Sequence, residues 1–178
     1  MHSLLLTLIF LMNVATSSKE DWASSGTMYF NNHKYSQAAY CFNRAGMTYE
    51  YEVANAYHLR LAAGRLTRDS KRSQRTDAYV SAAEAFHKSA SDSDSHERSR
   101  MYYRISAECY QEAQRFIEAA EGYREAEEYL ESVYSFMDGG EYDQVVEILR
   151  TRADELDPMV VDIKKECISH YIESGRTQ

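Results

Sequence analysis

Turn-forming residues are scarce in this sequence of 178 residues, which contains one proline and seven glycines. A protein built from strands and tight turns needs such residues at its many chain reversals. The middle of the chain is instead rich in alanine, glutamate, leucine and arginine, all of which favour helix. Hydrophobic residues make up 44% of the sequence, enough to bury a core. This composition predicts an all-α protein.

Basic residues are in the minority, with 20 Lys and Arg against 28 Asp and Glu and a net charge of −8. Binding to nucleic-acid phosphates requires clustered Lys and Arg, so this chain alone is not predicted to bind nucleic acid. One basic cluster nevertheless occurs between residues 60 and 75, where a solvated loop is the favoured interpretation. The weaker interpretation, contact with a nucleic-acid backbone, concerns four side chains: Arg68, Lys71, Arg72 and Arg75.

The cysteines are few and widely spaced, at Cys41, Cys109 and Cys167. An odd number at these intervals matches neither a disulfide framework nor a metal site. Cys41 and Cys109 sit beside aromatic residues in helical patterns, so we expect these two to be small buried hydrophobic side chains. Free thiols favour a reducing compartment, and therefore a nuclear or cytoplasmic protein.

An apolar run, MHSLLLTLIFLM, occupies the N-terminus. It is too short to span a bilayer as a helix, but it fits the hydrophobic part of a secretory signal, with Ala15 and Ser17 placed for cleavage. The segment lacks the Lys or Arg with which such signals begin. Residues 1–17 are therefore interpreted either as a signal-like leader, which implies secretion, or as a spurious or truncated start. No membrane span is predicted.

The usual motifs of catalysis and cofactor binding are missing. The sequence contains no G-x-x-x-x-G-K-[ST], G-x-G-x-x-G, H-E-x-x-H, C-x-x-C or G-x-S-x-G. Glu84 with His87, and Glu166 with His170, have helical spacing, but two ligands on one turn do not make a metal site. We therefore predict no catalytic, cofactor-binding or metal-binding residue, and a chain that is not an enzyme.

A pattern of large and small side chains begins at Trp22 and recurs from Tyr103 and again from Tyr129. The first copy comprises Trp22, Gly26, Tyr29, Tyr35, Ala38, Phe42 and Ala45. The second comprises Tyr103, Ala107, Tyr110, Phe116, Ala119, Tyr123 and Ala126. The third comprises Tyr129, Val133, Phe136, Tyr142, Val145 and Leu149, and the pattern then fails at Arg152.

The spacing within a copy has a mechanical meaning. The first three positions form one stripe on a helix, and the last three form the same stripe on a second helix. Small residues such as Gly26 and Ala38 let the two helices approach closely, while rings such as Tyr29 and Phe42 fill the space beside them. Neither helix can bury its stripe alone, so pairs must stack in series. The pattern predicts an α-solenoid of antiparallel helix pairs, with about nine helices and no sheet.

Local signals predict the boundaries of these helices. Ser17 followed by Glu20 forms a capping-box pattern at the first helix. Gly46 ends the second helix, and Gly139 with Gly140 separates the two helices of the last unit.

The remaining boundaries follow from polar stretches and from the proline. Asp157 before Pro158 marks the start of a final helix. Residues 64–75 and 91–99 are predicted polar loops. The repeat domain is assigned to residues 18–174, in units near 18–50, 51–91, 98–127 and 128–153, with a terminal helix at 158–174.

The arrangement Trp-x3-Gly-x2-Tyr followed by Ala-x3-Phe-x2-Ala resembles the tetratricopeptide repeat (TPR). The match covers residues 19–52 and the unit that begins near Arg100. It departs at Ser25 and Glu50, where the family usually has leucine and proline. The step from Tyr103 to Tyr129 is also shorter than the family's period of about 34 residues, so we expect a tighter, less regular stack. The resemblance implies a scaffold that presents a groove to a peptide or protein.

A narrower resemblance covers about residues 21–172. The strings DWASSGTMYFNNHKYSQAAYCFNRAGMTYEYEVANAYHLR, YYRISAECYQEAQRFIEAAEGYREA and EYDQVVEILR look like one particular repeat region. It follows the motor core in fungal UvrD-like helicase proteins that carry TPR and ankyrin repeats. The resemblance implies a non-catalytic accessory region that contacts a helicase motor domain or another protein. A secreted free-standing adaptor is the alternative, and an enzyme with an unrecognised site is a less favoured one.

Partner contacts are expected on the first helix of each unit, which usually lines the ligand-binding face of a paired-helix solenoid. Five residues there lie off the packing stripe and are candidates for partner binding: Asn31, His58, Tyr102, Glu108 and Glu112.

Overall fold

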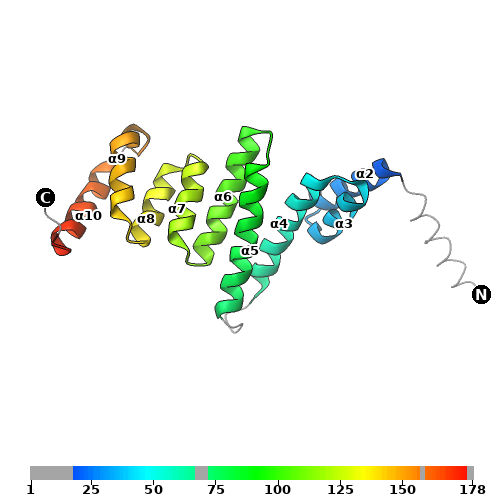
Figure 1. Cartoon of the computed structure of the whole chain (residues 1–178), viewed down its shortest axis with the longest axis horizontal. Helices are drawn as coiled ribbons and strands as arrows, with labels where there is room; N and C mark the ends of the chain where they lie inside the picture. The colour runs from blue at the N-terminus through cyan, green and yellow to red at the C-terminus, as the bar shows by residue number, and fades with distance from the viewer. Residues whose placement is uncertain (1–17, 67–71, 157–158, 176–178) are drawn as a thin grey trace, which may run out of the picture. The chain divides into compact units, whose positions relative to one another are not determined.

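The computed structural model describes residues 18–66, 72–156 and 159–175 of the chain. Every regular element within these ranges is a helix, so the predicted all-α fold, with nine helices and no sheet among the described residues, is confirmed (Figure 1). The helices are α2 Lys19–Asn31, α3 Tyr35–Ala45, α4 Thr48–Arg65, α5 Arg72–Ser91, α6 His96–Glu112, α7 Phe116–Glu125, α8 Tyr129–Asp138, α9 Tyr142–Leu156 and α10 Val160–Glu173. None of these helices combines the length and the apolar character that crossing a membrane requires. The leader, residues 1–17, lies outside the described residues.

The described chain divides into two compact units, one up to Leu61 and one from Ala62 onward. In the first unit α2 and α3 pack together, and Ala38, Phe42 and Ala54 form a buried core with Ala39. Gly26 is essential to this pair, because a Cβ atom built at its position would lie 2.7 Å from the Phe42 ring.

In the second unit each helix from α5 to α10 packs against the next helix in sequence (Figure 1). Such nearest-neighbour packing is the solenoid arrangement that the repeat predicts. A continuous core runs from α7 to α10 and includes Val133, Phe136, Val145, Ile148 and Ile163. The stripes of these helices are therefore buried against one another rather than around a single centre.

One kind of turn joins the helices from α6 to α9. Gln114, Glu127 and Gly140 are evenly spaced along the chain and have positive φ angles of 60°, 60° and 78°. In each turn the next backbone N–H donates to a carbonyl five residues earlier: Arg115 to Tyr110 at 2.9 Å, Glu128 to Tyr123 at 2.9 Å and Glu141 to Phe136 at 2.8 Å. This is the Schellman motif. The step from Tyr103 to Tyr129 in the sequence thus corresponds to two successive helices, each followed by the same turn.

Several predicted boundaries agree with the structure. Gly46 is the C-cap of α3 with a φ of 77°, and Gly139 and Gly140 separate α8 from α9. The terminal helix begins at Val160, while Asp157 and Pro158 themselves lie outside the described residues.

Other boundaries differ from the prediction. The capping box uses Ser18 and Asp21, one residue later than the predicted pair of Ser17 and Glu20. The predicted loop 64–75 is shorter, because α4 continues to Arg65 and α5 begins at Arg72. The predicted loop 91–99 is also shorter, because the Ser95 hydroxyl accepts a hydrogen bond from the Arg98 N–H and starts α6 at His96.

The failure of the sequence pattern at Arg152 has a structural counterpart. Arg152 interrupts the helical geometry of α9 with a φ of −134°. Its guanidinium lies 4.8 Å from the centre of the Tyr129 ring, a distance typical of a cation–π contact. The side chain therefore packs on the preceding helix through an aromatic face rather than through the stripe.

Candidate partner-binding groove

An apolar groove of about 460 Å³ lies between α9 and α10. Seven residues line it: Val146, Leu149 and Arg150 from α9, and Lys164, Cys167, Ile168 and Tyr171 from α10. The groove arises because α9 buries Ile148 in the core while the neighbouring Val146 remains 43% exposed. On α10, Ile163 and Cys167 are buried in the same way, and Ile168 remains 59% exposed.

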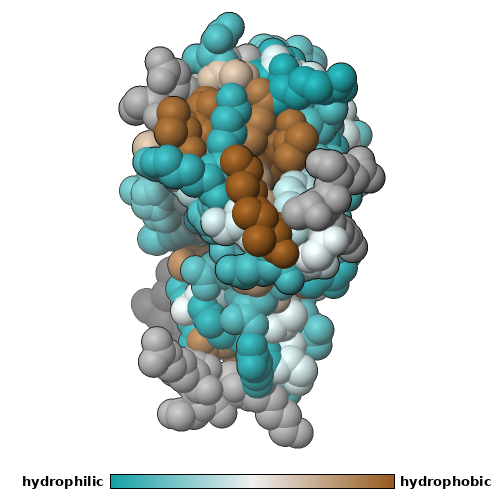
Figure 2. Space-filling view, turned by 90° about the vertical axis from the view of Figure 1, so that its left-hand side faces the viewer, coloured by the Kyte–Doolittle hydropathy of each residue, from teal (hydrophilic) through white to brown (hydrophobic). Residues whose placement is uncertain are grey.

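The apolar surface extends beyond the groove along α10. Val161 and Ile172 are 60% and 63% exposed, and with Ile168 they are spaced by seven and four residues, so the three share one face of the helix. Figure 2 views the end of the second unit that carries α10 and shows hydrophobic side chains gathered there. Contiguous exposed apolar surface of this kind typically marks an interaction site.

The C-terminal part of α10 is held against α9 by one pair of stacked rings and one hydrogen bond. The rings of Tyr142 and His170 stack with their centres 3.7 Å apart. The Tyr171 hydroxyl donates a hydrogen bond of 2.6 Å to the Asp143 carboxylate. Burial, and then the nearby Glu166 carboxylate, raise the pKa of the Tyr142 phenol, which therefore stays neutral. These contacts give the groove a fixed wall.

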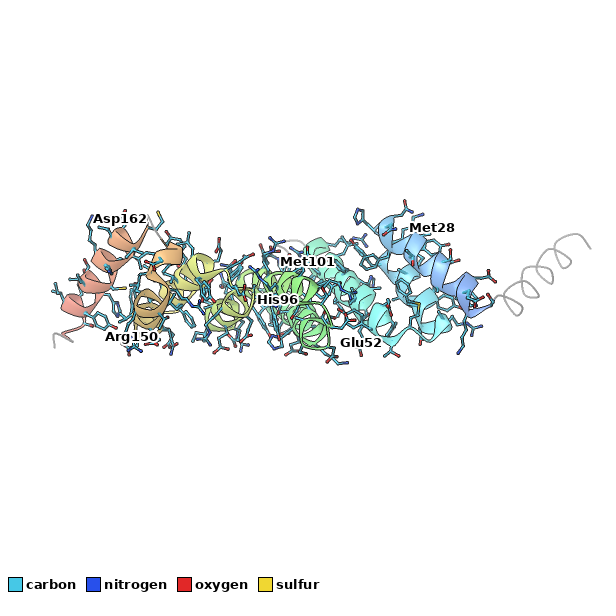
Figure 3. All side chains as sticks on the ribbon, turned by 90° about the horizontal axis from the view of Figure 1, so that it is seen from above. Met28, Glu52, His96, Met101, Arg150 and Asp162 are labelled. Carbon is cyan, nitrogen blue, oxygen red and sulfur yellow. The ribbon has the colours of Figure 1, made fainter. Side chains whose placement is uncertain are left out.

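Two cationic side chains border the groove. Arg150 donates hydrogen bonds to Glu147 at 2.8 and 2.9 Å, and its side chain is 73% exposed. Lys164 lines the groove from α10. In Figure 3 the labelled Arg150 and Asp162 lie on opposite edges of the α9–α10 pair. The groove can thus accept apolar side chains and, at its border, a carboxylate.

The thiol in the groove is not activated for chemistry. Burial, and then the negative charge of Glu166, raise the pKa of Cys167, so the reactive thiolate is disfavoured at neutral pH. All three cysteines are free and buried, as the sequence predicts for Cys41 and Cys109. Among the described residues no group of three or more His, Cys, Asp or Glu side chains could hold a metal ion.

The predicted partner-binding residues are distributed over both units. Asn31 is exposed and His58 is half-buried, both in the first unit, whereas the other three lie on α6 in the second unit. Tyr102 is a correction: it is only 6% exposed, and its ring lies 6.1 Å from that of Phe86, because α5 packs against this side of α6. Its side chain belongs to the core and is not available to a partner.

The two acidic candidates already have partners within the chain. Glu112 forms a 2.6 Å ion pair with Arg75, one of the predicted nucleic-acid contacts. Glu108 lies 4.0 Å from Arg104. Arg72, another predicted contact, donates to the Gln114 side chain in the α6–α7 turn. Arg72 and Arg75 therefore anchor the start of α5 to the end of α6, while Arg68 and Lys71 lie outside the described residues.

The packing positions of the repeat all lie within the helices or at their caps. Those that are buried are Gly26, Ala38, Phe42, Ala45, Ala107, Ala119, Tyr123 and Ala126. Those that are half-buried are Trp22, Tyr29, Tyr103 and Tyr110. The guanidinium of Arg44 lies 5.5 Å from the centre of the Trp22 ring, so this ring packs beneath a cation.

A polar network within the second unit could not be seen in the stripe pattern. The Tyr123 hydroxyl donates to the Gln111 carbonyl oxygen at 2.8 Å, and the Gln111 amide donates to the Ser135 hydroxyl at 3.1 Å. Burial, together with the negative charges of Glu108 and other nearby glutamates, raises the pKa of Tyr123 to about 12. The network joins α6, α7 and α8 and is structural, because every member is bonded to another.

Comparison of the chain with protein-family models, with curated proteins and with solved structures finds no match. The groove and its surroundings are therefore the basis for the function proposed below.

Proposed function

We propose that this chain is a non-catalytic protein-interaction scaffold that binds a partner segment in the groove between α9 and α10. The observation that carries the proposal is the exposed apolar face formed by Val146, Ile168 and Ile172 beside a groove of about 460 Å³. Pockets and clefts of this kind are lined mainly by apolar side chains, with a few polar groups that orient the ligand. Arg150 and Lys164 supply those polar groups.

The chemistry of the groove favours binding over catalysis. Its one thiol, Cys167, has a raised pKa, and its one phenol, Tyr171, donates to Asp143. The thiolate that nucleophilic catalysis at Cys167 would require is therefore disfavoured. The groove offers shape, apolar surface and positive charge, which are the elements of recognition.

The wider role follows from the sequence resemblance. The likeness of residues 21–172 to a repeat region of UvrD-like helicase proteins supports a TPR-type accessory region that contacts a helicase motor domain. The apolar residues 1–17 support the alternative, a secreted adaptor. Both roles use the same groove, and they differ in the partner that it meets.

Site-specific photo-crosslinking in the native cells tests the proposal. A photoreactive amino acid replaces Ile168 in the full chain and, in a control, replaces Met28, which is 52% exposed on α2 of the first unit. We expect a discrete protein adduct at position 168 and none at position 28. The partner, identified and purified, should bind Ile168→Asp at least about tenfold more weakly than the wild-type chain. An unchanged affinity for Ile168→Asp, or no adduct at position 168, contradicts the proposal.

A further inference from the structure

The apolar core of the second unit reaches the surface at α10. One buried cluster joins residues of α7, α8, α9 and α10 in series, from Ala120 to Cys167. Each adjacent pair along this series is covered by the helix that follows it: Phe136 of α8, Ile148 of α9 and Ile163 of α10 are all buried. Among the described residues of the second unit, no further helix covers the α9–α10 pair in the same way.

The shape of this surface matches a helix. In the preceding layers the covering helix buries apolar side chains spaced by three or four residues, such as Val145, Ile148 and Leu149 on α9. The exposed stripe on α10 is also helical in its spacing, with Val161, Ile168 and Ile172 on one face. An amphipathic helix laid along this groove continues the packing that already relates α8, α9 and α10.

The charges beside the stripe define the chemistry of that helix. Lys164 and Lys165 fall on the turn between Val161 and Ile168, one on each side of the stripe, because consecutive residues are about 100° apart around a helix. Lys165 forms a 3.0 Å ion pair with Asp162, and Lys164 is the lysine that lines the groove. Glu166 and Glu173 fall on a different face. The cations that line the groove are therefore Lys164 on α10 and Arg150 on α9, of which Arg150 also pairs with Glu147, although the whole chain carries a net charge of −8.

These observations also separate a foreign helix from a second copy of this chain. In a two-fold dimer each surface meets the same surface of its partner. Lys164 and Arg150 of one copy would then lie in the same interface as Lys164 and Arg150 of the other, and like charges across an interface are unfavourable. A helix that bears carboxylates is instead complementary to this border.

We infer that the α9–α10 groove binds an amphipathic helix of another protein, with aliphatic side chains on one face and Asp or Glu at the edges of that face. The inference rests on the proposed function and adds the class of partner. The partner helix completes the stack, its aliphatic side chains cover Ile168 and Val146, and its carboxylates meet Lys164 and Arg150.

A pair of synthetic peptides tests this inference with the full chain. The first is a fluorescent peptide of about three heptads with leucine at positions a and d and glutamate at e and g, and its twin has lysine at e and g. Like charges at e and g keep both peptides from pairing with themselves. We expect the glutamate peptide to bind at least about tenfold more tightly than the lysine twin at low salt. High salt should narrow this difference.

Variants of the chain locate the binding. Ile168→Asp should abolish binding of the glutamate peptide, and Met28→Asp should leave it unchanged. The combined variant Arg150→Glu, Lys164→Glu and Lys165→Glu should reverse the preference between the two peptides. Circular dichroism melts of each variant confirm that the exposed substitutions leave the fold intact.

Each contrary outcome has its own meaning. Equal binding of the two peptides, or binding that survives Ile168→Asp, overturns the inference. A dimer in sedimentation equilibrium that Ile168→Asp converts to a monomer also overturns it, because the occupant is then a second copy. If crosslinking at position 168 identifies a partner without an acidic amphipathic helix, the scaffold proposal stands and this inference falls. If the crosslink is also absent, both fall.

Discussion

The α2–α3 pair and the α6–α7 pair carry the same sequence pattern, but they achieve their close approach with different residues. In the first pair the small residue is Gly26 on the first helix, where a Cβ atom would lie 2.7 Å from the Phe42 ring. In the second pair the equivalent position is Ala107, and glycine appears on the other helix at Gly122, where a Cβ atom would lie 3.1 Å from the Ala107 methyl. Both pairs thus require a glycine where the two helices approach closely, and this glycine can lie on either helix of the pair.

The same two pairs also differ in polarity at one equivalent set of positions. Tyr123 and Gln111 of the second pair form a chain of hydrogen bonds with Ser135 of the following helix, α8. The equivalent positions of the first copy of the pattern are all apolar: Phe42, Phe30 and Ala54. Replacing a fully bonded polar set with apolar groups of similar shape can be nearly neutral in stability. The repeat therefore constrains shape, and polarity varies as long as each polar group is bonded.

The largest expected effect concerns the shape requirement in the first pair. Phe42→Ala should lower the free energy of unfolding by about 3–5 kcal/mol, because it leaves a cavity in the core. Gly26→Ala should cost about 1–3 kcal/mol by overpacking against the ring. The double variant should cost less than the sum, since the new methyl group occupies space that the ring has left. Chemical denaturation followed by circular dichroism measures all three.

A matched pair in different units provides the control. Phe42→Ala combined with Gly122→Ala should give additive losses, because Phe42 packs against Gly26 in the first unit and Gly122 packs against Ala107 in the second. Additive losses for Gly26→Ala and Phe42→Ala would mean that the close contact between these two residues does not limit the packing of α2 and α3.

The next effect concerns the polar set. Tyr123→Phe should cost about 1–3 kcal/mol, because the half-buried side-chain oxygen of Gln111 loses its donor. Adding Gln111→Phe and Ser135→Ala copies the apolar set of the first pair and should recover most of this loss. Chemical denaturation of Tyr123→Phe and of the triple variant measures the two free energies of unfolding that this prediction compares. A triple variant less stable than Tyr123→Phe alone would show that apolar side chains cannot replace the hydrogen-bonded set in the second unit.

A smaller effect should appear in alkaline solution. The pKa of Tyr123 is raised from its ordinary value of 10 to about 12, so the folded chain favours the neutral phenol. The associated stability is present below pH 10 and is lost as the pH rises toward 12, because the unfolded chain releases its proton first. Between about pH 9 and about pH 11 the loss should be about 1 kcal/mol.

The first helix pair again supplies the comparison, since Phe42 cannot ionise. The slope of stability against pH should become shallower in Tyr123→Phe. Equal slopes for the wild type and Tyr123→Phe would mean that the Tyr123 phenol ionises as readily in the folded chain as in the unfolded one.

The two helix pairs also show what the sequence could predict. The stripes through Phe42 and Tyr123 were visible because apolar periodicity depends on helix geometry alone, and the helices form where these stripes lie. The burial of Tyr102 was not predicted, because the stripe describes one face of α6 and α5 covers another. Gln114 and Glu127 gave no sign of a turn with positive φ, since that conformation usually belongs to glycine.

Predicting the groove would have required knowledge of contacts between helices, which the apolar pattern of the sequence does not contain. Which face of α10 meets α9 is decided by contacts such as the stacking of Tyr142 on His170, residues that are distant in the sequence. The exposed positions of Val161 and Ile168 follow from that orientation and not from their own apolar character. A candidate site based on the first helix of each unit therefore pointed elsewhere, to residues such as Glu112, which pairs with Arg75 within the chain.

The smallest effects separate backbone requirements from packing requirements. Gly46 in the first unit and Gly140 in the second have positive φ angles of 77° and 78°, and neither has a crowded environment: a Cβ atom at Gly140 would meet nothing within 4 Å. Alanine at either site should cost about 1 kcal/mol, from backbone strain alone. Gly64 near the end of α4 lacks a positive φ, so Gly64→Ala should instead stabilise the chain by about 0.5–1 kcal/mol. Thermal denaturation of the three single variants decides the matter, because a loss of stability in all three would assign the cost to crowding by the added methyl group rather than to the turn.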